Sequence, residues 1–149
     1  MENTSTKALV QEILSEEKQL LTSSYFKLQK LFEEKYGENT VVLMEIGTFF
    51  EVYEINNEDE QVGKAKEIAQ LLNIQLTRKN KNIIENSEEN PLMAGVPSVS
   101  LEKHLSKIIS EEKYTIVLSL LNECVIYSAL SDWRTNRVPM FTFIAPTLF

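Results

Sequence analysis

The sequence predicts an α/β domain in which helices flank a mixed β-sheet, and three patterns support this class. Apolar residues recur at helical spacing near the N-terminus. A β-branched apolar run and an alternating segment follow them, as expected for two strands. Helical and extended patterns then alternate along the chain. After the first helical segment, the expected order is helix, strand, strand, helix, strand, helix and strand.

The first 36 residues predict two helices. Leu9, Val10, Ile13 and Leu14 recur at helical spacing within a segment from about Thr6 to Leu21. The second helix is expected from about Ser24 to Tyr36, and Gly37 lies where a left-handed C-terminal cap would fall. Its apolar stripe falls at steps of three and four residues and consists of Leu21, Tyr25, Leu28, Phe32 and Tyr36.

Two strands are expected next. The run Thr40–Ile46 is nearly all apolar and rich in β-branched residues, as in a buried strand. After Gly47 and Thr48, the segment Phe49–Ile55 alternates in character. Side chains two residues apart leave the same face of a strand. The alternation therefore predicts one face with Phe49, Glu51, Tyr53 and Ile55.

The second half of the chain predicts shorter elements. We expect a mobile loop between the third helix and the fourth, because the segment is polar and has no period. The expected elements are a helix at Lys64–Leu72, a strand at Ile74–Thr77, the loop at Arg78–Asn90, a turn-rich connection around Gly95 at Pro91–Pro97, a helix over Leu101–Ile109 and a strand at Tyr114–Leu121. The stretch Asn122–Phe149 has no clean period toward its end, so we do not assign it to the core.

Length and composition fit one soluble domain. The chain has 149 residues, of which 43% are hydrophobic and 25% charged. No apolar run approaches the roughly 20 residues that span a bilayer, and the N-terminus does not resemble a signal peptide. The single cysteine, Cys124, is compatible with a reducing cytoplasm, where we expect the protein to act. The net charge of −7 opposes nonspecific adhesion to phosphate backbones.

The sequence offers little for catalysis. None of the four glycines begins a GxxxxGK[ST] loop, so no phosphate-binding P-loop is expected. One histidine, His104, and one cysteine cannot form a His/Cys zinc cluster. The acidic runs at positions 58–60 and 88–89 are typical of solvated faces. We therefore expect no enzyme activity, catalytic residue, metal or cofactor in this chain.

Phe49 and Glu51 combine a flat apolar ring and a carboxyl group on one predicted face. A nucleic-acid base can stack on such a ring and meet a polar group with its edge. An aromatic side chain that enters the minor groove unstacks a base step, and a mismatched step costs less to unstack. The carboxyl group would either be protonated and donate to a base nitrogen, or penalise normal duplex by repulsion. From these residues alone, an ordinary amphipathic strand with aromatic core residues is the favoured explanation, because aromatic residues are common in strands.

Four blocks of the sequence follow one another over roughly residues 20–118. The run 42–53 is an apolar strand followed by glycine and an aromatic-Glu segment, and the run 64–79 is a helix and a strand. Pro91–Pro97 reads Pro-Leu-Met-Ala-Gly-Val-Pro, and a helix at 101–109 comes after it. In content and order these blocks resemble the N-terminal mismatch-recognition domain of MutS-type DNA mismatch repair proteins, whose turn reads Pro-Met-Ala-Gly-Ile-Pro.

This resemblance implies an α/β module that contacts mismatched double-stranded DNA from the minor-groove side. Phe49 would stack on the mispaired base and Glu51 would hydrogen-bond to it. Arg78, Lys79 and Lys81 would contact phosphates, although a solvated loop explains this basic cluster equally well. ATP and Mg belong to full-length family members, whose other domains, or another repair subunit, would be this chain's protein partners.

The sequence also departs from the family pattern. Thr48 replaces the usual aspartate, and residues 122–149 do not align with the family. We expect an N-terminal helical extension at 1–21, the mismatch-recognition domain at 22–121 and an atypical tail at 122–149, truncated or frameshifted. An inactive fragment of a split or decayed gene and a protein-interaction module remain the alternatives. We expect the isolated chain to be a monomer with no membrane partner.

Overall fold

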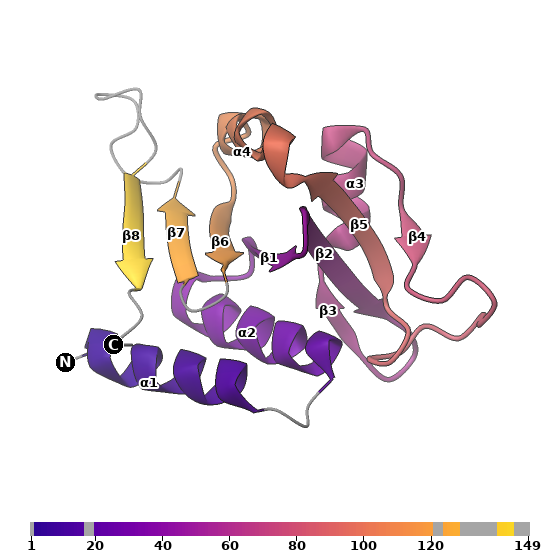
Figure 1. Ribbon diagram of the computed structural model, residues 1–149, viewed down its shortest axis with the longest axis horizontal. Helices are drawn as coiled ribbons and strands as arrows, with labels where there is room; N and C mark the ends of the chain where they lie inside the picture. Colours follow the sequence, from indigo (N-terminus) through magenta and orange to yellow (C-terminus); the bar gives the residue numbers. More distant parts are fainter. Residues whose placement is uncertain (1, 17–19, 121–123, 129–139, 145–149) are drawn as a thin grey trace.

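The computed structural model describes residues 2–16, 20–120, 124–128 and 140–144. These residues form one mixed sheet of eight strands with helices on both faces, as Figure 1 shows. The predicted α/β class is confirmed. Within the described residues, no helix has both the length and the apolar character needed to span a membrane.

The chain enters the sheet through two helices and then alternates between strands and helices. The elements are α1 (Glu2–Ser15), α2 (Leu21–Tyr36), β1 (Thr40–Ile46), β2 (Phe49–Asn56), β3 (Gln61–Gly63), α3 (Ala65–Leu72), β4 (Thr77–Arg78), β5 (Leu92–Pro97), a 3₁₀ turn η1 (Ser98–Ser100), α4 (Leu101–Ser110), β6 (Thr115–Ser119), β7 (Cys124–Ser128) and β8 (Met140–Ile144). The sheet order is β4-β5-β2-β1-β6-β7-β8, and β3 pairs with β2. Among the strands that the structure describes, β1 and β6 are the one pair that runs parallel.

Helix α2 is joined to β1 by buried hydrogen bonds as well as by apolar contacts. The Gln29 side chain donates to the Thr40 carbonyl at 2.7 Å and accepts from the Val42 amide at 2.9 Å. The Tyr25 hydroxyl donates to the Val42 carbonyl at 2.6 Å. The pairing of β1 with β2 covers only residues 44–46. The α2 side chains therefore satisfy backbone groups that would otherwise be buried without partners.

The other face of β2 is joined to α3. Glu54 is buried, and its carboxyl group accepts a hydrogen bond from the Lys66 amide in the first turn of α3, at 3.0 Å. A carboxylate in that position also interacts favourably with the helix dipole. Gly63 pairs with Glu54 and has a φ of +90°. A Cβ atom there would lie 2.1 Å from the Tyr53 carbonyl oxygen, so only glycine is compatible with this close approach.

The structure corrects the expectation for Pro91–Pro97. Residues 92–97 form β5, which is paired with β2 along six residues, instead of a turn-rich connection. Glycine and proline at positions 95 and 97 suggested a turn, but Pro97 is the last residue of the strand and Gly95 lies inside it. The strand expected at Ile74–Thr77 is also shorter and lies later in the chain. It is β4, at Thr77–Arg78, and residues 74–76 belong to no strand. Strand β5 therefore lies along the edge of β2 that faces away from β1, next to the candidate site.

The loop between β4 and β5 is organised by asparagine side chains, although the sequence predicted a mobile segment. The buried Asn90 side chain accepts from the Asn80 amide at 2.7 Å and donates to the carbonyl of Ile83 at 3.0 Å. Asn86 accepts from the Asn56 amide and donates to the Glu54 carbonyl, which ties the loop to β2. These contacts give the basic residues at the start of the loop a defined position.

The segment after residue 121 contributes to the sheet. Strand β7 pairs with β6, and β8 pairs with β7. Cys124, Val125 and Ile126 are buried in the core. Their burial was not foreseen from the sequence, because the period is weak in this region. The remaining residues of the expected tail lie outside the described part of the chain, and so do residues 17–19 of the expected N-terminal extension.

Candidate functional site

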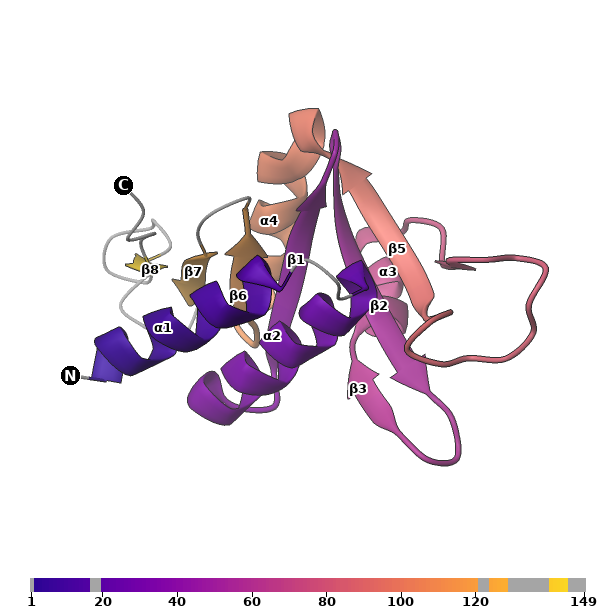
Figure 2. The same cartoon turned by 60° about the horizontal axis from the view of Figure 1, so that its bottom comes forward.

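Strand β2 is covered by α2 at one end and open to solvent at the other. Tyr53 is 1% exposed, and its ring meets the Tyr25 ring of α2 edge-on at a centroid distance of 4.9 Å. Phe49, four residues earlier on the same side of the strand, is 45% exposed. Figure 2 shows α2 crossing in front of the lower parts of β1 and β2, whereas the upper ends of these strands and β5 lie clear of it. The exposed ring of Phe49 therefore lies where the helical cover ends.

A hollow of about 340 Å³ opens on this uncovered part of the sheet. It includes Phe49 and Glu51 from β2, Lys81 from the loop after β4, and residues of β5. The complete lining consists of Phe49, Glu51, Gln75, Thr77, Lys81, Met93, Ala94 and Gly95. The hollow thus presents an aromatic ring, a carboxyl group and an ammonium group to one space. Three of the five residues expected to bind DNA lie around it.

The other two expected residues are placed differently. Arg78 lines a neighbouring hollow of about 340 Å³ that also includes Lys81. Its guanidinium group donates to the Ile83 carbonyl at 3.4 Å, so it is directed along its own loop. Lys79 is exposed, but its side chain does not line either of these hollows. Lys81 is therefore the basic residue that the two hollows share.

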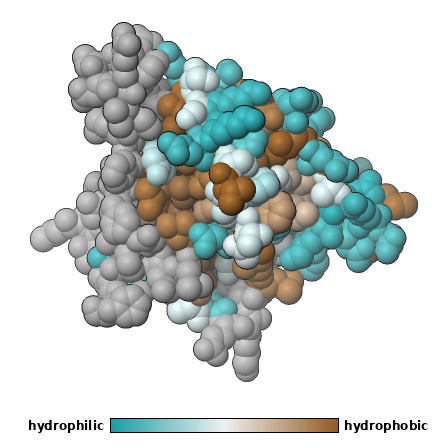
Figure 3. Space-filling view, turned by 45° about the horizontal axis from the view of Figure 1, so that its top comes forward, coloured by the Kyte–Doolittle hydropathy of each residue, from teal (hydrophilic) through white to brown (hydrophobic). Residues whose placement is uncertain are grey.

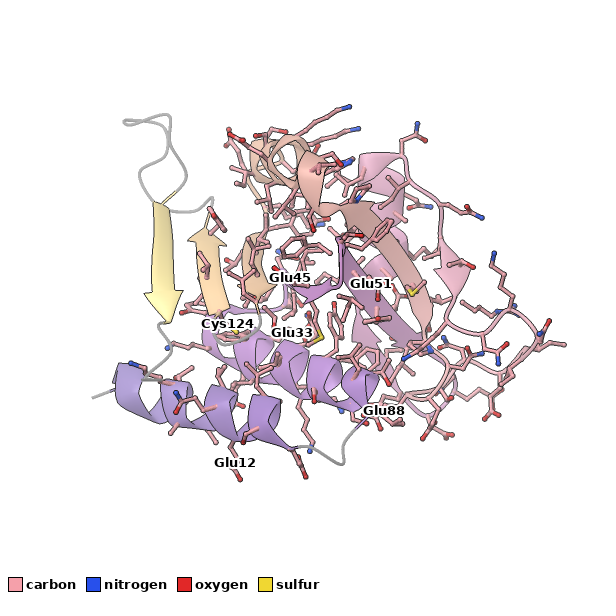
Figure 4. All side chains as sticks on the ribbon, in the orientation of Figure 1. Glu12, Glu33, Glu45, Glu51, Glu88 and Cys124 are labelled. Carbon is pink, nitrogen blue, oxygen red and sulfur yellow. The ribbon has the colours of Figure 1, made fainter. Side chains whose placement is uncertain are left out.

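Glu51 is oriented by a neighbour on its own strand. The hydroxyl of Tyr53 donates a hydrogen bond to Oε2 of Glu51. Burial raises the pKa of Tyr53, and the hydrogen bond to Glu51 and its negative charge raise it further. The phenol therefore remains a donor throughout the neutral range. Figure 4 shows Glu51 on β2, which lies between β1 and β5 in the sheet.

The turn before Phe49 is tied to the end of β5. The Ser98 amide donates to the Thr48 carbonyl at 2.8 Å, and Phe49 pairs with Pro97. Val99, in the same 3₁₀ turn, is 97% exposed. In Figure 3, which views this end of the molecule from above, apolar atoms lie among hydrophilic ones. Val99 was not singled out from the sequence, because an isolated valine between two serines has no distinctive pattern.

The described residues offer no site for metal chemistry, since no group of three or more His, Cys, Asp or Glu side chains among them could hold an ion. Cys124 is completely buried. His104 is only partly buried on α4, and burial together with the charges of Lys103 and Lys107 lowers its pKa. The hollow beside Phe49, which combines an aromatic ring, a carboxyl group and an ammonium group, is the candidate ligand site.

Comparisons with known proteins identify relatives of this chain. A family model described as MutS domain I matches residues 22–123. A mutS homolog of Acanthamoeba polyphaga mimivirus, named for DNA mismatch repair, is 32% identical over 121 residues. The alignment covers 74% of this chain and 10% of the relative. The chain thus spans about a tenth of the length of that protein.

Proposed function

Because the chain belongs to the MutS domain I family, we propose that it binds mismatched double-stranded DNA as the recognition module of a MutS-type mismatch repair protein. Membership confirms the family resemblance predicted from the sequence. In this proposal Phe49 stacks on a mispaired base and Glu51 hydrogen-bonds to it. Lys81 contacts a nearby phosphate, while Arg78 and Lys79 contribute to the positive charge of the same loop.

The exposed ring of Phe49 carries the proposal. A phenylalanine on a strand gains stability from burial, worth about 1.5–3 kcal/mol for a side chain of this size. Phe49 remains 45% exposed, next to a carboxyl group and beside an open hollow. An aromatic ring in this position can insert beside a base pair, and a mispair offers less resistance to insertion than a matched pair. Selectivity for mispairs then arises without reading the surrounding sequence.

The net charge of the chain supports a limited role for this domain in DNA binding. With a net charge of −7, the chain is expected to bind DNA weakly by itself, because association with duplex DNA depends on neutralising phosphates. In this proposal, other domains of a longer protein or a second repair subunit would supply the clamp and the ATPase activity. Domain I would then contribute discrimination, and the rest of the assembly would contribute affinity.

Binding to a G·T-mismatched duplex and to a matched duplex, measured by fluorescence anisotropy at low salt, tests the proposal. We expect the wild-type chain to prefer the mismatched duplex and Phe49→Ala to lose that preference. Stacking worth about 1–3 kcal/mol corresponds to roughly 5- to 150-fold in affinity. Leu9→Ala on α1 is the matched control, because Leu9 is similarly exposed, at 43%, and lies outside the hollow. Equal affinity for both duplexes in the wild-type chain would refute the proposal.

A further inference from the structure

Helix α4 carries two lysines that have no acidic partner within the part of the chain that the structure describes. Lys103 and Lys107 are both exposed and lie four residues apart, so they leave the same face of the helix. Neither belongs to an ion pair with another described residue. Burial lowers the pKa of His104, and the charges of both lysines lower it further, so both ammonium groups lie near its imidazole ring. Two uncompensated cations therefore share one face of α4.

Lysines on α2, by contrast, are neutralised by acids beside them. Lys27 forms an ion pair with Glu16 at 3.1 Å. Lys30 forms one with Glu60 at 2.8 Å. In a chain with a net charge of −7, a lysine paired in this way adds little to the attraction for phosphates, because the adjacent carboxylate cancels its field. The unpaired lysines of α4 are available to displace counterions from a duplex.

These two lysines lie at the same end of the sheet as Phe49. Phe49 pairs with Pro97, the last residue of β5, and η1 leads directly from there into α4. Lys103 is in the first turn of α4, and Lys107 follows about 6 Å further along the helix axis. Figures 1 and 2 both show α4 beside the end of the sheet where β1 and β2 meet. The ring and the two cations can therefore meet one extended ligand.

We propose that Lys103 and Lys107 bind backbone phosphates of the duplex into which Phe49 inserts, which makes α4 a second backbone contact besides Lys81. This inference rests on the proposed function and names the part of the DNA that α4 recognises. Each strand of a duplex carries one phosphate per about 3.4 Å of axis, so ammonium groups about 6 Å apart can meet neighbouring phosphates of one strand. Like charges at this spacing disfavour a helix, and bound phosphates remove that repulsion. An acidic protein segment offers the same charge, but the position beside Phe49 favours DNA.

The two backbone contacts come from different elements around the ring. Lys81 lines the hollow beside Phe49, whereas the α4 lysines approach through η1, at the end of β5. Phosphate contacts fix the register and orientation of a protein on a duplex and carry no information about base pairing. The α4 lysines thus hold the minor groove over Phe49, and the choice between matched and mismatched pairs is left to the ring.

Salt titrations of binding to a G·T duplex and to a matched duplex test the α4 contact. Lys103→Ala and Lys107→Ala should each weaken binding to both duplexes by about two- to fivefold at low salt, and each should lower the slope of log affinity against log salt by about 0.9. Alanine is a strong helix former, so α4 should remain folded. Lys66→Ala is the matched control. Lys66 is also an exposed helical lysine, but its amide bonds Glu54, at the far end of β2 from Phe49.

Duplexes with single methylphosphonates, which lack the charge of one phosphate, locate the contact. Substitution at adjacent positions of one strand near the mispair should weaken wild-type binding. It should have no further effect at those positions in the chain with both alanine substitutions. If that double variant keeps wild-type affinity and salt slope while the preference for G·T still depends on Phe49, the inference is overturned and the proposed function stands. Equal wild-type affinity for both duplexes refutes the proposed function alone, and the salt slope then decides whether α4 binds DNA. A chain that binds neither duplex overturns both.

Discussion

Gly95 lies directly across from Glu51 in the antiparallel pair of β5 and β2. Its missing side chain leaves room for the acid at the edge of the hollow, since a Cβ atom would lie 3.4 Å from Cγ of Glu51 and 3.3 Å from the Phe50 carbonyl oxygen. The backbone of Gly95 has no positive φ, so the constraint on this position is one of space and not of conformation. The residue expected to shape a turn instead borders the candidate site.

Gly95→Ala should weaken mismatch discrimination more than it weakens folding. The added methyl group would lie against Cγ of Glu51 and would press on the Phe50 carbonyl oxygen, and we expect the resulting shift of Glu51 to reduce the preference for a G·T duplex by about 3- to 10-fold. Stability should change by less than about 1 kcal/mol, because alanine suits a strand better than glycine does. Gly37→Ala is the contrasting variant, because a Cβ atom at Gly37 would meet open space but the backbone φ is +103°. This variant should be less stable than wild type and should still prefer the G·T duplex. Anisotropy and thermal unfolding measure the two effects.

Lys81→Ala should weaken binding to matched and mismatched duplexes by a similar factor. A phosphate contact carries no information about pairing, and losing one lowers the slope of log affinity against log salt by about 0.9. Salt titrations from 20 to 200 mM provide the measurement. Lys66→Ala on α3, on the opposite side of the sheet, should leave both affinity and slope unchanged. A selective loss of mismatch binding in Lys81→Ala would show that the lysine contacts the base and not the phosphate.

Gln29→Leu should destabilise the domain by about 2–4 kcal/mol, although it places an apolar residue in the core. The change leaves the Val42 amide and the Thr40 carbonyl buried without their partner. Gln70→Leu, on the exposed side of α3, changes the same atoms in solvent and should have a small effect. Urea unfolding followed by circular dichroism compares the two variants. If Gln29→Leu were as stable as wild type, the hydrogen bonds to β1 would contribute nothing to folding.

Glu67 should make stability depend on acid pH. Burial raises the pKa of Glu67, but hydrogen bonds from Tyr114 and Lys113, together with the charges of Lys113 and Lys64, outweigh it and leave the pKa below 4.5. A lowered folded-state pKa adds stability above the unfolded-state value, and this stability is lost as pH falls through the folded-state pKa.

The difference in unfolding free energy between wild type and Glu67→Gln should therefore be present at pH 7 and shrink as the pH falls through the lowered pKa of Glu67. Chemical unfolding across this range measures it. Glu102→Gln on the exposed side of α4 provides a matched change of charge. This change in stability should be small, because the ion pair between Glu67 and Lys113 is partly exposed to solvent and is screened by it. A difference that grew as the pH fell would contradict the sign.

The strands with a clear period could be predicted from the sequence, but the strand β5, which pairs with β2 beside the candidate site, could not. The apolar run at 40–46 and the alternation after it predicted β1 and β2 closely. Strand β5 was missed, because glycine and proline ordinarily interrupt strands. The neighbouring sequence does not reveal that β2 pairs with a segment that contains both residues. The common side of Phe49 and Glu51 followed from alternation alone. The role of Gln29 could not be foreseen, since it depends on which backbone groups of β1 lack a strand partner.

The parallel pairing of β1 with β6 joins residues about 75 positions apart in the chain, at Thr40 and Thr115. Contacts of such long range slow folding, because the intervening chain must be ordered before they form. Until β6 arrives, the apolar strand β1 has an unpaired edge, which is a site for aggregation. Shortened versions of the domain that end before residue 115 should therefore express as insoluble material, and versions that retain β6 should be the better starting point for crystallisation and NMR.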